Sequence, residues 1–178
     1  MINTLITSKT RIKLLFKFFL NGESYSYLRN LEQEFGESTN AIRLELNRFE
    51  KSGLLLSWNE SNRKLYKANP DHPMYSILQK IVYRELRVNS LLNDNVLNSY
   101  NIIRVYLIGN FNEGINNYVR SIVFIRQDTK PGEKDKDLEK ELSLQEFNFN
   151  YNILSPEKFI EYKQALATKP PVLIWKAE

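Results

Sequence analysis

In the first half of the chain, apolar residues recur at the three- and four-residue spacing of amphipathic helices. The pattern predicts helices over about 8–22, 25–36 and 38–52. Ser8 and Ser38 are the expected N-caps of the first and third helices, and a glycine marks the C-terminal end of each of the three. Apolar runs on both sides of a polar turn then predict a β-hairpin over 54–68. This half therefore reads as three short helices followed by a hairpin.

A fourth helix is predicted after the hairpin, opened by Pro73 in its first turn. Its apolar stripe consists of Met74, Ile77, Leu78, Ile81, Val82 and Leu86. A stripe of this kind packs either into the core of its own domain or against a second copy of the chain.

The pattern changes in the second half, where β-rich runs replace the helical stripes. Strands are predicted at 102–108, 122–125, 147–153 and 172–175, with a helix opening at Ser155. Residues 89–100 are rich in Asn and Ser, and their apolar residues do not recur at a helical or strand spacing. We therefore expect an α+β protein with one domain over 1–88, a linker or helix extension over 89–100, and a small α/β domain over 101–178.

Three helices and a hairpin in this order are typical of a winged helix-turn-helix domain, in which the third helix enters the major groove of DNA. Asn pairs well with adenine and Arg with guanine, and cations at the hairpin tip suit phosphate. The expected DNA-binding residues are Ser38, Thr39, Asn40, Arg43, Leu44, Asn47 and Lys51 of the third helix and Asn62, Arg63 and Lys64 of the hairpin.

The charge distribution supports contact between the first half and a polyanion. The whole chain has a formal net charge of +4, but residues 1–88 hold 14 Lys and Arg against 9 Asp and Glu. Residues 89–178 hold 11 against 12. The excess of positive charge therefore lies entirely in the half with the helix and the hairpin.

The run GESTNAIRLELNRFEKSGLLLSWNESNRKLYKAN, residues 36–69, resembles the recognition helix and wing of bacterial ArsR-like and MarR-like transcriptional regulators. The shared features are a small polar cap, an Arg in the first turn and a closing Glu-x-x-Gly-Leu, and the resemblance extends over roughly the first 85 residues. It implies sequence-specific binding of double-stranded DNA by a homodimer. The stripe from Met74 to Leu86 would then form the dimer interface.

The run VYLIGNFNEGINNYVRSIVFI, residues 105–125, resembles the first two strands and glycine turn of the minimal nucleotidyltransferase fold. The resemblance implies an anion-binding turn, and the candidate residues here are Gly109, Asn110 and Gly114. Active members have Ser where this chain has Asn110, and an Asp pair where it has Val119 and Ser121. A two-metal site cannot be built from those side chains, so the resemblance is to a catalytically inactive member.

Several kinds of chemistry are excluded by composition. The chain has no cysteine, which rules out disulfides, thiolate metal sites and a cysteine nucleophile. It has one histidine, which leaves little room for a histidine-based triad or a metal site with several histidines. The Asp-x-Asp at 135–137 lies in a charged loop, where we expect solvated or helix-start carboxylates. We expect no metal, no cofactor and no catalytic activity, and because no apolar run has the length of a membrane helix we expect a cytoplasmic protein.

Together these features predict a transcriptional regulator that acts by occupying its operator, with a C-terminal domain that serves as a sensor or interaction module. Two alternatives stay open: an active nucleotidyltransferase with a substrate-binding winged helix, and a winged helix used for protein contact alone. The operator sequence, the direction of regulation and any effector are not specified by the sequence.

Overall fold

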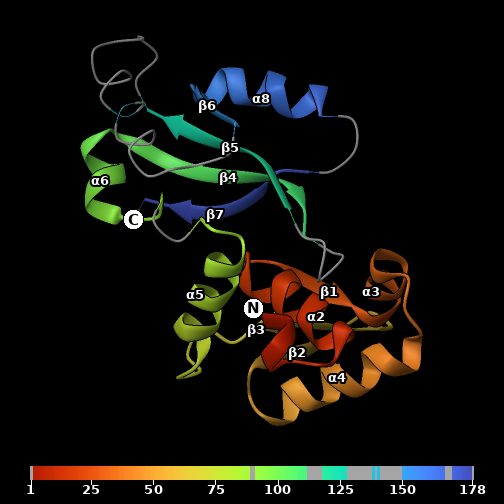
Figure 1. Cartoon of the computed structure of the whole chain (residues 1–178). Helices are drawn as coiled ribbons and strands as arrows, with labels where there is room; N and C mark the ends of the chain where they lie inside the picture. Colours follow the sequence, from red (N-terminus) through yellow and green to blue (C-terminus); the bar gives the residue numbers. More distant parts are fainter. Residues whose placement is uncertain are drawn as a thin grey trace. The chain divides into compact units, whose positions relative to one another are not determined.

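The computed structural model of the chain describes residues 2–88, 91–111, 118–127, 138, 140, 150–166 and 170–177. Helices accompany a three-stranded antiparallel sheet and a four-stranded mixed sheet, which confirms the α+β class (Figure 1). The described residues up to Leu86, together with Phe111, form one compact unit, here the N-terminal unit. Those from Arg87 to Asn110 and from Tyr118 onward form the C-terminal unit. Within the described ranges, every helix is too short or too polar to cross a bilayer.

The N-terminal unit contains the predicted helices and hairpin, together with two elements that the apolar pattern did not predict. Its elements are α1 (Ile2–Leu5), α2 (Lys9–Phe19), β1 (Tyr25–Tyr27), α3 (Leu28–Phe35), α4 (Thr39–Lys51), β2 (Leu55–Glu60), β3 (Arg63–Ala68) and α5 (Tyr75–Glu85). The strand order is β1-β3-β2. The unpredicted elements are α1 and β1, and β1 occupies the residues expected to begin the second helix.

The helix boundaries follow the local capping chemistry that the sequence indicated. The Ser8 side chain accepts a hydrogen bond from the Arg11 backbone N–H at the start of α2, and Ser38 accepts one from Ala41 at the start of α4. Gly36 ends α3 with φ of 62°, a left-handed conformation that glycine adopts at little cost. Only two residues separate this glycine from α4, so the turn fixes the direction in which α4 starts.

The core of the N-terminal unit is built around α2. This helix contacts α1, α4, α5 and β3. The helical spacing predicts one apolar stripe on it, formed by Ile12, Leu15, Phe16 and Phe19, and all four are buried, but so are Leu14 and Phe18, which lie outside that stripe. A helix covered on several sides buries more than one face, and so the single predicted stripe underestimates its burial. The core leaves α4 on the outer side of its unit, at the bottom of Figure 1.

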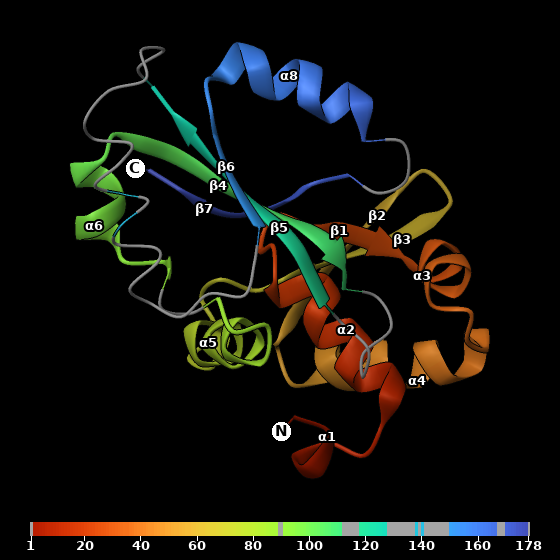
Figure 2. The same cartoon turned by 45° about the horizontal axis from the view of Figure 1, so that its top comes forward.

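The C-terminal unit is a mixed sheet with strand order β6-β5-β4-β7. Its elements are α6 (Asp94–Ser99), β4 (Ile102–Asn110), β5 (Tyr118–Arg126), β6 (Asn150–Leu154), α8 (Pro156–Ala165) and β7 (Val172–Lys176). Strands β5 and β6 pair in parallel, and the other pairs are antiparallel. Figures 1 and 2 show α8 running along β5 and β6, and the Phe159 ring of α8 stacks on Tyr106 of β4 with centroids 4.4 Å apart.

Two segments of the C-terminal unit differ from what the sequence indicated. The segment expected to be a linker or helix extension contains α6, capped by Asn93, and Trp175 of β7 donates a hydrogen bond of 2.6 Å to Asp94 at its start. Strand β5 begins at Tyr118, four residues before the predicted start, because the residues ahead of its apolar run pair with the end of β4. The sequence also predicts a charged loop over 127–137 followed by a short helix, and this region lies largely outside the described residues. Residues 147–149 of the strand predicted at 147–153 lie outside them as well.

Replacing Gly36 tests the turn that aims α4. Because no atom lies within 4 Å of a Cβ built at this position, Gly36→Ala should lower the free energy of unfolding through backbone strain alone, by about 1 kcal/mol. Gly36→Asn should cost less, since Asn tolerates the left-handed region. Denaturation followed by Trp58 fluorescence in a Trp175→Phe background reports on this unit alone, and an Ala variant as stable as the parent would contradict the account.

Candidate functional site

The five side chains expected on the outer face of α4 are exposed in the structure. They are Asn40, Arg43, Leu44, Asn47 and Lys51. The opposite side of the helix buries Ile42, Leu46 and Phe49 in the core. Leu44 is an exception among the polar residues of the outer face, because it is an apolar side chain that is 51% exposed.

A buried carboxylate fixes α4 against α2. Glu45 is 5% exposed and accepts hydrogen bonds from Arg11 Nε at 2.9 Å, Ser8 Oγ at 3.1 Å and Arg48 Nη1 at 2.9 Å. Burial alone would raise the pKa of Glu45, but the hydrogen bonds from Arg11 and Ser8 outweigh it and hold the pKa below its usual range. Glu45 is therefore a charged anchor between the two helices, a role that the sequence analysis did not predict.

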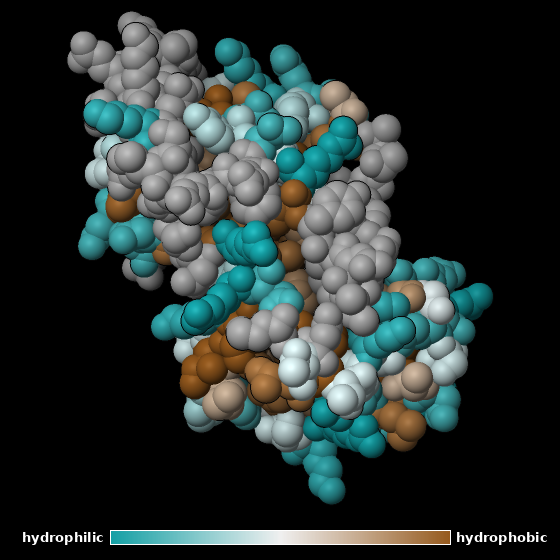
Figure 3. All heavy atoms as spheres, in the orientation of Figure 1, coloured by the Kyte–Doolittle hydropathy of each residue, from teal (hydrophilic) through white to brown (hydrophobic). Residues whose placement is uncertain are grey.

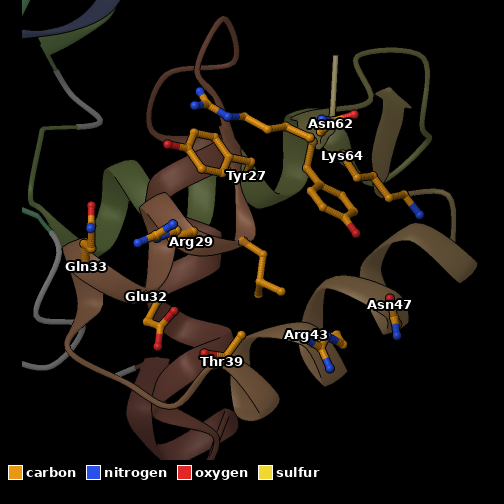
Figure 4. Close-up of a pocket in the computed structure, with 12 residues that line it drawn as sticks. Tyr27, Arg29, Glu32, Gln33, Thr39, Arg43, Asn47, Asn62 and Lys64 are labelled. Atoms are coloured by element: carbon orange, nitrogen blue, oxygen red, sulfur yellow. The ribbon is translucent and has the colours of Figure 1, made fainter. Parts of the chain in front are cut away.

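One hollow on the N-terminal unit brings together β1, α3, α4 and the β2–β3 hairpin, with a cavity volume of about 950 Å³. Figure 4 shows its labelled residues surrounding it from these elements. The lining consists of Tyr27, Leu28, Arg29, Glu32, Gln33, Thr39, Arg43, Asn47, Asn62, Arg63, Lys64 and Tyr66. We call this hollow the basic groove.

The basic groove joins some of the residues expected from the sequence and adds others. Thr39, Arg43 and Asn47 of α4 line it with all three hairpin residues, whereas Asn40, Leu44 and Lys51 lie on α4 outside the lining. The Ser38 hydroxyl is engaged as the helix cap. The lining residues of β1 and α3 were missed, because they become neighbours of α4 only through the tertiary fold.

The charge of the basic groove is predominantly positive. Arg29, Arg43, Arg63 and Lys64 line it, with Glu32 as the acidic lining residue. Within the described part of the chain, Arg29 and Arg43 have no hydrogen-bond or ion-pair partner. The Arg63 guanidinium lies over the Tyr27 ring, 4.8 Å from its centroid. Three guanidinium groups are therefore available to an anionic ligand.

Lys64 differs from these arginines because it is already paired. Its Nζ lies 2.6 Å from Glu50 Oε1 and 2.7 Å from Glu50 Oε2, and Ser57 Oγ donates a hydrogen bond of 2.5 Å to the same carboxylate. The hydrogen bonds from Lys64 and Ser57 lower the pKa of Glu50, and the bond to Glu50 raises the pKa of Lys64. The sequence indicated Lys64 as a phosphate contact but did not reveal that α4 carries its counter-ion.

The glycine segment of the C-terminal unit does not have the expected form at its start. Gly109 and Asn110 are the last two residues of β4, where they pair with Val119 and Tyr118 of β5. They belong to a strand and do not open a turn, because the pairing of β4 with β5 extends further than the apolar residues do. Gly114 and the Asp-x-Asp at 135–137 lie outside the described residues. Ser121, expected at a lost carboxylate position, is buried in β5.

The apolar stripe of α5 divides between the core and the surface. Val82 and Leu86 are buried, Leu78 and Ile81 are half-buried, and the two at the start of the stripe are exposed, Met74 by 42% and Ile77 by 46%. Figure 3 shows hydrophobic surface over α5. Only the first part of the stripe is therefore free to contact another chain in the way that the sequence predicted for all six residues.

No group of three or more His, Cys, Asp and Glu residues suited to a metal is found in the described ranges. The single histidine, His72, accepts a hydrogen bond from the Met74 backbone N–H at Nδ1, and its Nε2 lies 3.2 Å from the Ser52 carbonyl oxygen. The chain matches none of the protein-family models, and neither the curated proteins nor the solved structures include a significant match to it. The case for a function therefore depends on the residues themselves.

The Glu45 anchor makes a pH-dependent prediction. Because the folded-state pKa is depressed, the charged carboxylate stabilises the fold above about pH 4.5, and this contribution is lost as the pH falls through the folded pKa. Glu45→Gln should lower the free energy of unfolding by about 1–3 kcal/mol at pH 7. The difference from wild type should shrink as the pH falls below about 4.5, and it should vanish once the pH is below the depressed folded pKa, where the wild-type carboxyl is also neutral.

Denaturation curves between pH 3 and pH 7, followed by Trp58 fluorescence in the Trp175→Phe background, measure this difference. Glu161→Gln, at an exposed position of α8, is the matched control and should leave the curves unchanged. A Glu45→Gln difference that stays constant across the whole pH range would show that the charge on Glu45 does not stabilise the fold.

Proposed function

We propose that the chain is a sequence-specific regulator of transcription that binds double-stranded DNA through a winged helix-turn-helix in its N-terminal unit. The observation that carries this proposal is the basic groove, in which the exposed side of α4 and the β2–β3 hairpin present amide and guanidinium groups together. The order of elements from α2 to β3, with β1 completing a three-stranded sheet, supports the same assignment. Regulation would follow from occupancy of the operator.

The outer face of α4 is suited to reading base edges. Arg43 and Asn47 are one turn apart, and both side chains are exposed. Arg reads guanine through O6 and N7, Asn reads adenine through N6 and N7, and the exposed Leu44 can contact a thymine methyl group. The core residues Ile42, Leu46 and Phe49 keep this face outward, so α4 can enter a major groove without a change in the fold.

The residues proposed to contact the phosphate backbone lie on the α3 and hairpin sides of the basic groove. Arg29 at the start of α3 and Arg63 on the hairpin both line it and have no carboxylate partner among the described residues. Asn62 at the hairpin turn adds an amide donor. Cations placed this way neutralise phosphates and release counterions, which gives affinity that falls steeply with salt.

The DNA-binding form is proposed to be a homodimer. Met74 and Ile77 expose apolar surface on α5 next to the cations Lys80 and Arg84 of the same helix. Pairing of two α5 helices would place two α4 helices on half-sites about one helical turn apart. The C-terminal unit is proposed to act as a non-catalytic sensor or interaction module, and its effector is unknown.

Arg43 tests the base-reading role. On DNA fragments that the purified protein selects from a random pool, Arg43→Ala should weaken binding by about 1–3 kcal/mol, because a bidentate contact to guanine is lost. Binding to unselected fragments should change much less. Fluorescence anisotropy at several salt concentrations measures both, with Lys158→Ala on α8 as a control that should bind like wild type. Equal losses on selected and unselected DNA would contradict base reading by Arg43.

Met74 and Ile77 test the dimer. A Met74→Glu/Ile77→Glu variant buries two carboxylates in the proposed interface and should sediment as a monomer, with at least tenfold weaker binding to a site with two half-sites. Ile160→Glu, at a 60% exposed position of α8, is the matched control and should remain dimeric. A wild-type protein that sediments as a monomer when bound to DNA would overturn this part of the proposal.

A further inference from the structure

The Glu50–Lys64 pair gives the basic groove a cation that is present but occupied. Both carboxylate oxygens of Glu50 lie within 2.7 Å of Lys64 Nζ, so the ammonium group contacts both oxygens of the carboxylate. Ser57 Oγ of β2 holds the same carboxylate in place. Glu50 is also the acidic residue of the Glu-x-x-Gly-Leu run. It is not one of the residues of α4 proposed to read bases, so its role is not explained by base reading.

The geometry of the pair favours its survival in a DNA complex. Glu50 lies in the last turn of α4 and Lys64 on β3, so both belong to regular elements that keep the two groups together without a new loss of conformational freedom. A phosphate that approached Lys64 would also approach the Glu50 carboxylate, which repels it. Arg63, one residue earlier on the same strand, offers a cation with no carboxylate partner in the described ranges.

We propose that Glu50 masks Lys64, so that in the wild-type protein this hairpin lysine makes no phosphate contact and becomes a DNA-binding cation only when the carboxylate is removed. The inference rests on the proposed function and assigns Glu50 the role of limiting sequence-independent affinity. Non-specific binding is almost entirely electrostatic, so one fewer free cation in the groove lowers affinity for every DNA sequence alike.

A double-mutant cycle on Glu50 and Lys64 tests this assignment, with random-sequence duplex DNA as the probe and anisotropy read at several salt concentrations. Lys64→Met alone should leave the slope of log affinity against log salt close to wild type, because no phosphate contact is lost. The affinity itself should fall modestly, because the Glu50 carboxylate is then left unpaired beside the DNA. Glu50→Gln should steepen the slope of log affinity against log salt by about 0.9 for each bound chain. Its affinity near 0.15 M salt should rise about fivefold by counterion release.

The double variant Glu50→Gln/Lys64→Met should return to the wild-type slope, because the unmasked cation is then absent. Glu60→Gln on β2 is the matched control, since it removes a carboxylate from the same hairpin that has no partner within the described residues. It should leave the salt slope unchanged. Thermal unfolding of each variant shows whether a change in binding follows a change in folding.

Three results would overturn the inference. A Lys64→Met variant that already flattens the slope by about 0.9 would mean that phosphate displaces Glu50 in the wild-type complex. A Glu50→Gln variant with weaker DNA binding would mean that Glu50 serves to position the hairpin. If Glu50→Gln raised the DNA affinity equally in the wild-type and Lys64→Met backgrounds, the gain would come from removing a negative charge near the DNA and not from freeing Lys64. Salt-independent or absent binding by wild type would instead refute the proposed function, and the inference with it.

Discussion

The buried carboxylate of Glu45 is the interaction on which the orientation of α4 depends. A carboxylate that is 5% exposed can remain ionised only because Arg11, Ser8 and Arg48 supply hydrogen bonds to it. Two of these donors lie at the start of α2, the helix around which the core is packed. The rotation of α4 about its axis is therefore set by a polar contact as well as by Ile42, Leu46 and Phe49, and this rotation decides which residues face outward.

Ion pairing within the N-terminal unit separates its cations into two groups. The occupied group consists of cations that are ion-paired within the unit: Arg11 and Arg48 on Glu45, Lys13 on Glu37, Lys17 on Glu34, Lys64 on Glu50 and Lys67 on Glu23. The arginines of the basic groove remain outside these pairs. A net charge counted along the sequence does not distinguish the groups, so the positive surface offered to a ligand is more localised than the composition suggests.

Local sequence rules predicted much of the fold but not the assembly of the site. Ser8, Ser38 and Gly36 mark helix boundaries through contacts within four residues, and such contacts can be predicted from the local sequence. Strand β1 has only three residues and exists because it pairs with β3, about 40 positions later. The same limit hid Arg29 as a groove residue and Glu50 as the partner of Lys64, since both relations arise from elements that are distant in sequence. In the second half, Gly109 was predicted to lie in a turn but belongs to a strand, because β4 pairs with β5 as far as Asn110.

The most direct test of the account is to map the DNA contact surface by amide chemical shifts of the ¹⁵N-labelled chain titrated with a duplex selected from random DNA. The account predicts that the largest salt-sensitive changes fall on α4 and the hairpin, at residues such as Thr39, Asn47 and Asn62, with α8 unaffected. Changes concentrated on the C-terminal unit, or none at all, would contradict the assignment of the basic groove as the DNA-binding surface.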